Sequence, residues 1–134
     1  TDLVLQRREG RLLWQILSES GLDGFYMAEE EALKSVEASN TVIATGGSAV
    51  YYEAAMAHLK SLGTVVYMRL PFEEIESRIR NLATRGVAMK PGMTLRDTYN
   101  ERLPLYEKYA DVTIDCTGSP EHNADQIVKA VAGN

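Results

Sequence analysis

The sequence predicts an α/β domain with a mostly parallel sheet flanked by helices. Short apolar runs rich in β-branched residues at 41–45, 64–70 and 112–116 are typical of buried strands. Stretches with helical spacing of apolar residues separate these runs, and this alternation indicates βαβ units. The 134 residues, 45% of them hydrophobic, suffice for one domain with a buried core. We find no repeat or linker, so residues 1–134 are predicted to form a single domain.

The chain before the first predicted strand is expected to be helical. Residues 1–10 have the pattern of a strand end that passes into a short helix, closed by a glycine. Apolar residues at helical spacing then predict helices over 12–20 and 25–38. Gly21 and Gly24 separate these two helices, because glycine interrupts a helical pattern.

Four further helices are expected, over residues 51–62, 72–82, 95–110 and 124–132. Gly63 is expected to cap the first of them. Pro71 stands where a helix begins, a position at which its missing N–H costs nothing. Pro104 should kink or split the helix in which it lies. Ser119 is predicted as an N-cap, with Pro120 at the first helical position.

The first predicted strand ends in Gly46 and Gly47, and a helical pattern follows. In open α/β sheets, ligands bind at the carboxyl edge of the strands, where such a turn would present backbone N–H groups. Glycine also permits close approach of the backbone to a ligand. The alternative is a plain strand-to-helix turn that needs glycine only for a positive φ angle, and the motif alone does not separate the two.

Composition excludes several classes of function. The formal net charge is −5, with basic and acidic residues interspersed, which argues against a nucleic-acid platform. No apolar run approaches the ~18 residues of a membrane span. The only cysteine, Cys116, follows a predicted strand and is expected to be a buried thiol in a protein of a reducing, cytoplasmic compartment. His58 and His122 have no partners at metal-ligand spacing, so we predict no protein metal site.

Four arginines are candidates for chemistry. Arg78, Arg80 and Arg85 flank or lie in the polar, glycine-bearing loop 84–94, and Arg102 follows later in the chain. Cations on a mobile loop beside a sheet edge suit phosphoryl transfer, because charge spreads over the phosphate oxygens. Solvated arginines on helix surfaces are the alternative for each of them.

Several motifs occur along the chain in an order and at spacings that together are specific. They are Thr1-Asp2, Phe25-Tyr26-Met27-Ala28-Glu29, Gly46-Gly47-Ser48, Val66-Tyr67-Met68-Arg69-Leu70-Pro71-Phe72-Glu73-Glu74, and Arg102-Leu103-Pro104-Leu105-Tyr106 followed by Tyr109-Ala110-Asp111. With these motifs the whole chain resembles the shikimate kinase family. The resemblance implies a P-loop kinase-like three-layer fold and ATP-dependent phosphorylation of a ring hydroxyl of shikimate, a step of aromatic amino acid biosynthesis.

The resemblance also implies an acceptor site formed by Asp2, Tyr26, Glu29, Gly46, Gly47 and Arg102. Asp2 would hydrogen-bond the hydroxyl that becomes the nucleophile, and would align or deprotonate it. The backbone at Gly47 would contact the ring of the acceptor. Arg102 would bind the acceptor carboxylate in a bidentate geometry.

On the nucleotide side, the resemblance implies that ATP and Mg²⁺ are the cofactors. Arg85 would be catalytic, covering the ATP phosphates from the loop 84–94, which is expected to be a mobile lid. Arg78 would bracket the adenine together with the turn that contains Gly118 and Pro120. A monomer with a small-molecule substrate is expected.

The chain departs from the family pattern at two acceptor-side positions. Tyr26 stands where the family has a second carboxylate-binding arginine, and a phenol offers neither a charge nor a fork of donors. Ser48 replaces a third glycine. Two alternatives therefore stay open: a related kinase with another hydroxy-acid or sugar acceptor, and a catalytically dead module that binds the acceptor.

The sequence contains no Gly-x-x-x-x-Gly-Lys-Ser/Thr motif. Kinases of this fold bind the phosphates with that loop. In the family the loop precedes the strand end that corresponds to Thr1-Asp2, so we expect this chain to lack the first strand, the phosphate-binding loop and the first helix. By itself the chain is expected to be inactive and to bind ATP weakly.

Overall fold

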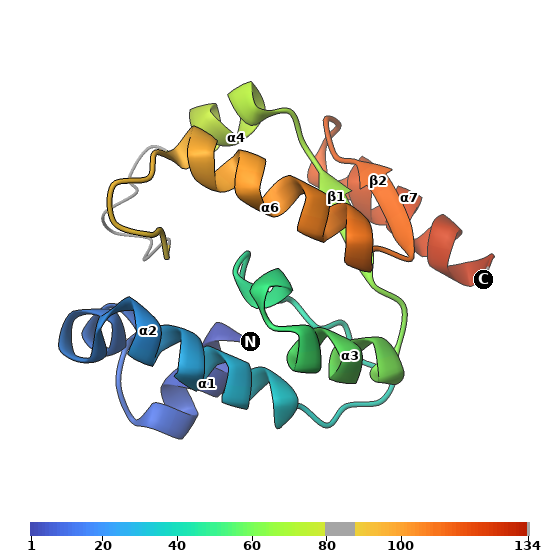
Figure 1. Ribbon diagram of the computed structural model, residues 1–134. Helices are drawn as coiled ribbons and strands as arrows, with labels where there is room; N and C mark the ends of the chain where they lie inside the picture. The colour runs from blue at the N-terminus through green and yellow to red at the C-terminus, as the bar shows by residue number, and fades with distance from the viewer. Residues whose placement is uncertain (80–87, 134) are drawn as a thin grey trace.

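The computed structural model describes residues 1–79 and 88–133 and gives a helix-rich α/β fold (Figure 1). Its elements are α1 (Asp2–Glu9), α2 (Leu13–Lys34), the 3₁₀ helix η1 (Ala49–Tyr51), α3 (Glu53–Leu62), β1 (Val66–Arg69), α4 (Phe72–Arg78), α6 (Leu95–Tyr109), β2 (Val112–Asp115) and α7 (Pro120–Ala132). Helices α1, α2, η1 and α3 form one half of the molecule, and β1, α4, α6, β2 and α7 form the other half. No helix among the described residues is long and apolar enough to cross a membrane.

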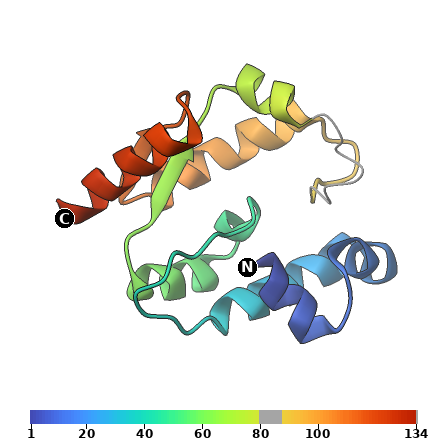
Figure 2. The same ribbon diagram turned by 180° about the vertical axis from the view of Figure 1, so that it is seen from behind.

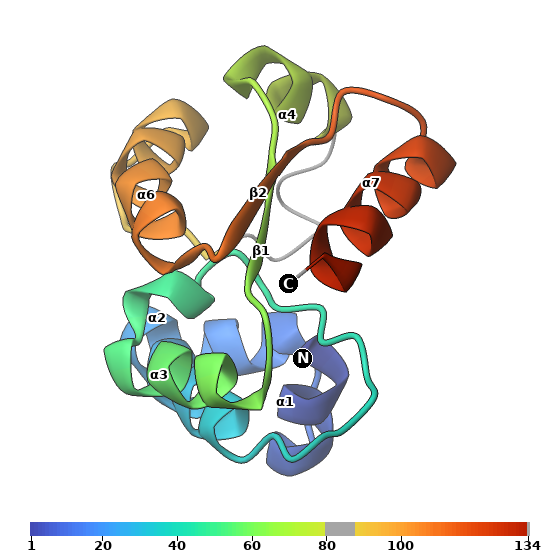
Figure 3. The same cartoon turned by 90° about the vertical axis from the view of Figure 1, so that its right-hand side faces the viewer.

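The predicted parallel sheet is confirmed for its last two strands. β1 and β2 pair in parallel, with Val66 opposite Val112 and Arg69 opposite Asp115. Figure 3 shows α6 on one side of this pair and α7 on the other, so helices cover both faces. Such coverage is expected of parallel strands, which are joined by crossover helices.

The predicted strand over 41–45 is wrong for the described residues. This segment runs beside the N-terminus without joining a sheet (Figure 2), and Val42 is 95% exposed. The segment is bound to the N-terminus by a hydrogen bond, in which the Thr1 amino group donates to the Ala44 carbonyl at 2.6 Å. An apolar run forms a strand only where another strand supplies hydrogen-bond partners, and the two described strands pair with each other.

Two predictions for the first helices need correction. Helix α1 already begins at Asp2, so the apolar residues 3–5 lie in a helix and not in a strand end, and Gly10 closes this helix in the left-handed region at φ 66° as expected. The predicted break between two helices is confirmed, because α2 is interrupted by a kink at Gly21, but the second helix ends at Lys34 and not at residue 38. Gly21 has φ 68° and ψ −176°, values that are open to glycine but strained for other residues.

Pro104 lies inside α6 without splitting it, so of the two predicted outcomes, a kink or a split, the split is wrong. The ring removes the N–H that would bond the Asn100 carbonyl one turn earlier. Both residues are exposed, so water can satisfy that carbonyl and the helix continues to Tyr109.

The other helices match the expectations in part. Helix α3 begins at Glu53, after η1, and its C-cap Gly63 has extended backbone and lies outside the left-handed region. Helix α4 ends at Arg78, whereas the predicted helix extended to residue 82. Residues 80–82 of that prediction lie outside the described residues. Helix α7 already begins at Pro120, because the Ser119 side chain accepts a hydrogen bond from the His122 N–H, as a cap should.

Two apolar clusters form the core of the α1–α3 half. One contains Leu33, Ala49, Val50, Tyr52, Ala55, Met56 and Leu59, and the other contains Leu5, Ile16, Phe25, Ala32 and Ala88. Ala88 belongs to the loop that leads into α6, so this end of the loop is fixed on α1 and α2. Cys116, as predicted, is a buried free thiol, and burial raises its pKa.

Candidate functional site

A cleft of about 310 Å³ opens where the two halves of the molecule meet. Residues from α1, α2, α4 and α6 line it, together with Ala88 and the turn before η1. Five of the predicted acceptor residues are among them: Asp2, Glu29, Gly46, Gly47 and Arg102. Residues that lie as far as 100 positions apart in the sequence therefore meet around one cavity of ligand size.

Close packing explains the two glycines of the turn. Neither Gly46 nor Gly47 has a positive φ angle, so the plain-turn interpretation does not account for them. A Cβ atom at Gly47 would lie 3.0 Å from both Arg102 Nη1 and the Tyr106 hydroxyl oxygen. A Cβ atom at Gly46 would lie 2.9 Å from Glu29 Oε1. The glycines thus let the backbone approach charged and polar groups of the cleft wall.

Arg102 places a buried positive charge in the cleft. The residue is 7% exposed, and its Nη2 donates to the Ala88 carbonyl at 2.6 Å and its Nε to the Tyr51 hydroxyl at 3.2 Å. Its Cζ lies 5.2 Å from the centre of the Tyr51 ring. Within residues 1–79 and 88–133 no carboxylate pairs with it. A buried guanidinium without a counter-ion favours an anionic ligand.

The surroundings of Arg102 keep it charged. Burial acts to lower the pKa of the guanidinium, but the hydroxyls of Tyr51 and Tyr106 outweigh this effect, and the pKa lies above its ordinary value. Tyr106, one helical turn beyond Arg102, also donates to the Gly47 carbonyl at 2.7 Å. The arginine and the glycine turn are thereby fixed relative to each other.

Glu29 is a buried carboxylate in the opposite wall, 4% exposed. Its Oε2 accepts hydrogen bonds from the hydroxyls of Ser48 at 2.6 Å and Tyr52 at 2.7 Å. The pKa of Tyr52 is raised by burial and then by the hydrogen bond and the charge of Glu29, so this phenol remains a donor.

Asp2 is held beside the glycine turn by the residue before it. The Thr1 hydroxyl accepts from the Gly46 N–H at 3.3 Å, and the Thr1 amino group binds Ala44. Asp2 Oδ1 consequently lies 3.6 Å from the Cβ position at Gly46. Asp2 itself is exposed, and it is one of the residues that line the cleft.

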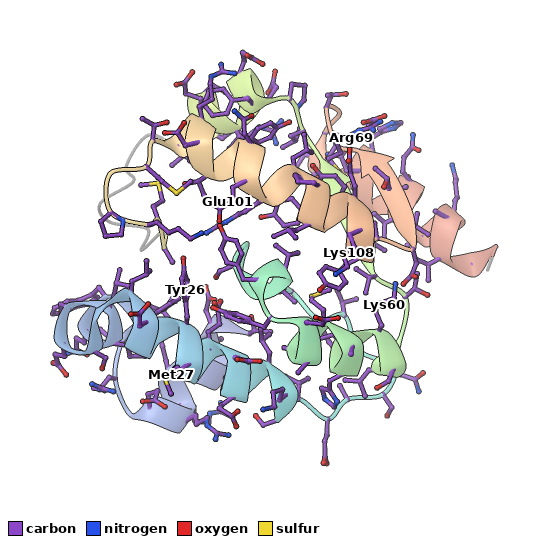
Figure 4. All side chains as sticks on the ribbon, viewed as in Figure 1. Tyr26, Met27, Lys60, Arg69, Glu101 and Lys108 are labelled. Atoms are coloured by element: carbon purple, nitrogen blue, oxygen red, sulfur yellow. The ribbon has the colours of Figure 1, made fainter. Side chains whose placement is uncertain are left out.

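Tyr26 is not among the residues that line the cleft. Its ring packs against Tyr51 and Tyr52, with centroid distances of 5.8 and 6.0 Å. Figure 4 shows the side chain pointing from α2 toward the half that contains α6, whereas the neighbouring Met27 points away. The Tyr26 hydroxyl is buried and has no hydrogen-bond partner in the described part of the chain. Burial raises the pKa of this phenol, which keeps it protonated.

The described residues predicted for the nucleotide side, Arg78, Gly118 and Pro120, do not line this cleft. Arg78 lies at the end of α4 with Glu74 as its ion-pair partner, and Gly118 and Pro120 lie at the start of α7. Arg85 falls outside the described residues, as does part of the predicted lid 84–94. No cluster of three metal-binding side chains occurs in the ranges 1–79 and 88–133.

Sequence reasoning assigned no role to several residues of this site. The omitted residues are Ser48, Tyr51, Tyr52, Ala88 and Tyr106. Tyr106 could have been found, since it stands four positions after Arg102 and so shares its helix face. Ala88 had no signal, because its position depends on how the loop packs.

The comparisons with known proteins agree on one family. The family model described as shikimate kinase matches residues 1–132. The shikimate kinase of Aquifex aeolicus is 33% identical over 134 residues, which are 99% of this chain and 79% of that protein. Shikimate kinase 2 of Yersinia enterocolitica is 31% identical, over 98% of this chain and 79% of that protein.

Solved structures give the same result. The shikimate kinase from Acinetobacter baumannii in complex with shikimate superposes with a TM-score of 0.84 at 29% identity, over 99% of this chain and 76% of that one. The shikimate kinase from Aquifex aeolicus gives a TM-score of 0.82, over 99% and 79%. The chain therefore belongs to the shikimate kinase family of phosphotransferases, enzymes that use ATP and Mg²⁺.

Proposed function

We propose that the intact protein, meaning the natural polypeptide that carries these residues, transfers the γ-phosphoryl group of ATP to a ring hydroxyl of shikimate. The proposal is carried by one observation: the guanidinium of Arg102 is buried in the cleft and has no carboxylate partner among the described residues. Shikimate is a hydroxylated ring with one carboxylate. The carboxylate would pair with Arg102, which offers a planar fork of donors.

The remaining side chains of the cleft suit the rest of this acceptor. Asp2 and Glu29 present oxygens near one point beside Gly46, where ring hydroxyls would donate to them. Asp2 would align and deprotonate the reacting hydroxyl, because it is the exposed carboxylate of the two. The backbone at Gly47 would lie against the ring. Positioning of the acceptor is the main contribution of this chain to the rate.

The proposed nucleotide-binding residues are inferred from the membership of the family and from where these residues stand in the sequence. ATP and Mg²⁺ supply the phosphoryl group and the charge that balances it. Arg78 and the turn at Gly118 and Pro120 would bracket the adenine, and Arg85 would cover the phosphates.

The direct test is phosphoryl transfer by the intact protein with MgATP and a panel of acceptors. The panel contains shikimate, other hydroxy acids and neutral sugars of similar size. We expect kcat/KM to be highest for shikimate. A preference for another acceptor would support a related kinase, and binding of shikimate without turnover would support a catalytically dead module. Either result contradicts the proposal.

The substitution Tyr26→Arg tests how position 26 relates to the acceptor. Tyr26 does not line the cleft, but its side chain points toward the half that contains α6 and packs against Tyr51, whose hydroxyl accepts from Arg102. We therefore expect a guanidinium at this position to add a charge-assisted contact with the acceptor carboxylate and to lower the KM for shikimate about tenfold. Glu29, three residues later on the same face of α2, would balance the added charge.

Met27→Arg is the matched control, since Met27 is 71% exposed and points away from the α6 half in Figure 4. It adds the same charge to the same helix and should leave the KM for shikimate unchanged. If Tyr26→Arg behaves like this control, position 26 does not face the acceptor.

A further inference from the structure

The carboxylate of Glu29 is bound in an asymmetric way. Both hydroxyls that reach it, from Ser48 and Tyr52, donate to the same oxygen, Oε2. No lysine, arginine or histidine lies within ion-pair distance among the described residues. A carboxylate has about four acceptor positions, so the second oxygen, Oε1, retains its capacity to accept hydrogen bonds.

Oε1 is directed toward the cleft. It lies 2.9 Å from the Cβ position at Gly46, and Oδ1 of Asp2 lies 3.6 Å from the same point. Glu29, Gly46 and Asp2 all line the cavity. Two carboxylate oxygens at one place on a cavity wall accept hydrogen bonds and cannot donate them, so this place fits a ligand with hydroxyl groups.

The two hydroxyls are themselves fixed in place. Ser48 is 5% exposed and precedes η1, and Tyr52 is 7% exposed and follows it. The Tyr52 ring belongs to the apolar cluster with Ala55 and Met56, which restricts its rotation. The donors therefore approach Oε2 from both ends of one short helix, and this arrangement sets the orientation of the carboxylate plane.

We propose that Ser48 and Tyr52 are positioning residues, whose hydroxyls hold Oε2 of Glu29 so that Oε1 accepts a hydrogen bond from a non-reacting ring hydroxyl of the acceptor. The inference rests on the proposed function and adds to it the residues that determine recognition of that hydroxyl. An unheld carboxylate would rotate about its last side-chain bond and recognise the hydroxyl less well.

The test uses Ser48→Ala, Tyr52→Phe and the double variant in the intact protein. We expect each single variant to raise the KM for shikimate about threefold to tenfold and the double variant to raise it further. The KM for ATP should stay within about twofold, since the cleft described here holds the acceptor. Ser48→Thr retains the hydroxyl and is expected to restore most of the affinity. Ser61→Ala, which removes an exposed hydroxyl from α3, is the matched control.

A second readout separates positioning from support of the fold. The KM for shikimate is compared with that for analogues that each lack one non-reacting ring hydroxyl. The unaltered protein should discriminate against one analogue about tenfold or more, and the double variant should lose most of this discrimination. If the double variant still discriminates against that analogue, or if the KM values for shikimate and ATP rise equally, Ser48 and Tyr52 are not positioning residues, and the proposed function is unaffected. Absence of shikimate phosphorylation by the unaltered protein overturns the proposed function and this inference with it.

Discussion

Replacing Arg102 by alanine is expected to raise the KM of the intact protein for shikimate by a factor between about 30 and several thousand. The guanidinium is buried beside Gly47 and has no carboxylate partner in the described chain, so the acceptor carboxylate would be its counter-ion. Truncating one partner of a buried charge pair costs ~2–5 kcal/mol, partly because the other charge is left unpaired. Each 1.4 kcal/mol corresponds to a tenfold change in affinity.

Steady-state kinetics with each substrate varied in turn measures this effect. The KM for ATP should change little, because the described residues expected on the nucleotide side, Arg78, Gly118 and Pro120, do not line the cleft. Arg102→Lys should recover only part of the loss, since an ammonium lacks the planar fork. Arg96→Ala is the control, because Arg96 is an exposed arginine of the same helix that pairs with Glu73. Equal damage to both substrates would assign Arg102 a structural role.

Replacing Asp2 by asparagine is expected to lower kcat about 10²- to 10⁴-fold with a much smaller change in the KM for shikimate. The amide preserves the shape of the side chain but cannot take up a proton, and general-base catalysis typically contributes a factor of this size. The position of Asp2 is set by Thr1, which contacts both Ala44 and Gly46. The amide should therefore occupy the same place as the carboxylate.

Single-turnover measurements distinguish a slower chemical step from slower product release. Asp23→Asn, at an exposed position of α2, makes the same chemical change away from the cleft and should leave kcat unchanged. A decrease of less than tenfold in kcat for Asp2→Asn would contradict the role of Asp2 as a base.

Local sequence signals predicted the elements that local chemistry determines. Ser119 caps α7 as expected, because the cap needs only its own side chain and the N–H of His122. The strands β1 and β2 were predicted within two residues at each end, since both carry a dense β-branched or apolar run. On the acceptor side, sequence motifs indicated five residues that line one cleft.

The segment 41–45 shows where such reasoning stops. Its composition is that of a buried strand, yet Val42 is almost fully exposed, because a strand depends on partners that no local pattern encodes. The same limit applies to Ala88 and Tyr52. Their roles at Arg102 and Glu29 depend on contacts across the fold, with 14 and 23 residues of sequence separation respectively.

The central claim is that Arg102 makes this cleft a site for a carboxylated acceptor. The most direct test is calorimetric titration of the intact protein with shikimate and with its uncharged methyl ester, repeated on Arg102→Ala. We predict that the unaltered protein binds the ester at least tenfold more weakly than shikimate, and that Arg102→Ala binds the two ligands with nearly equal affinity. Equal affinity of the unaltered protein for both ligands would contradict the claim.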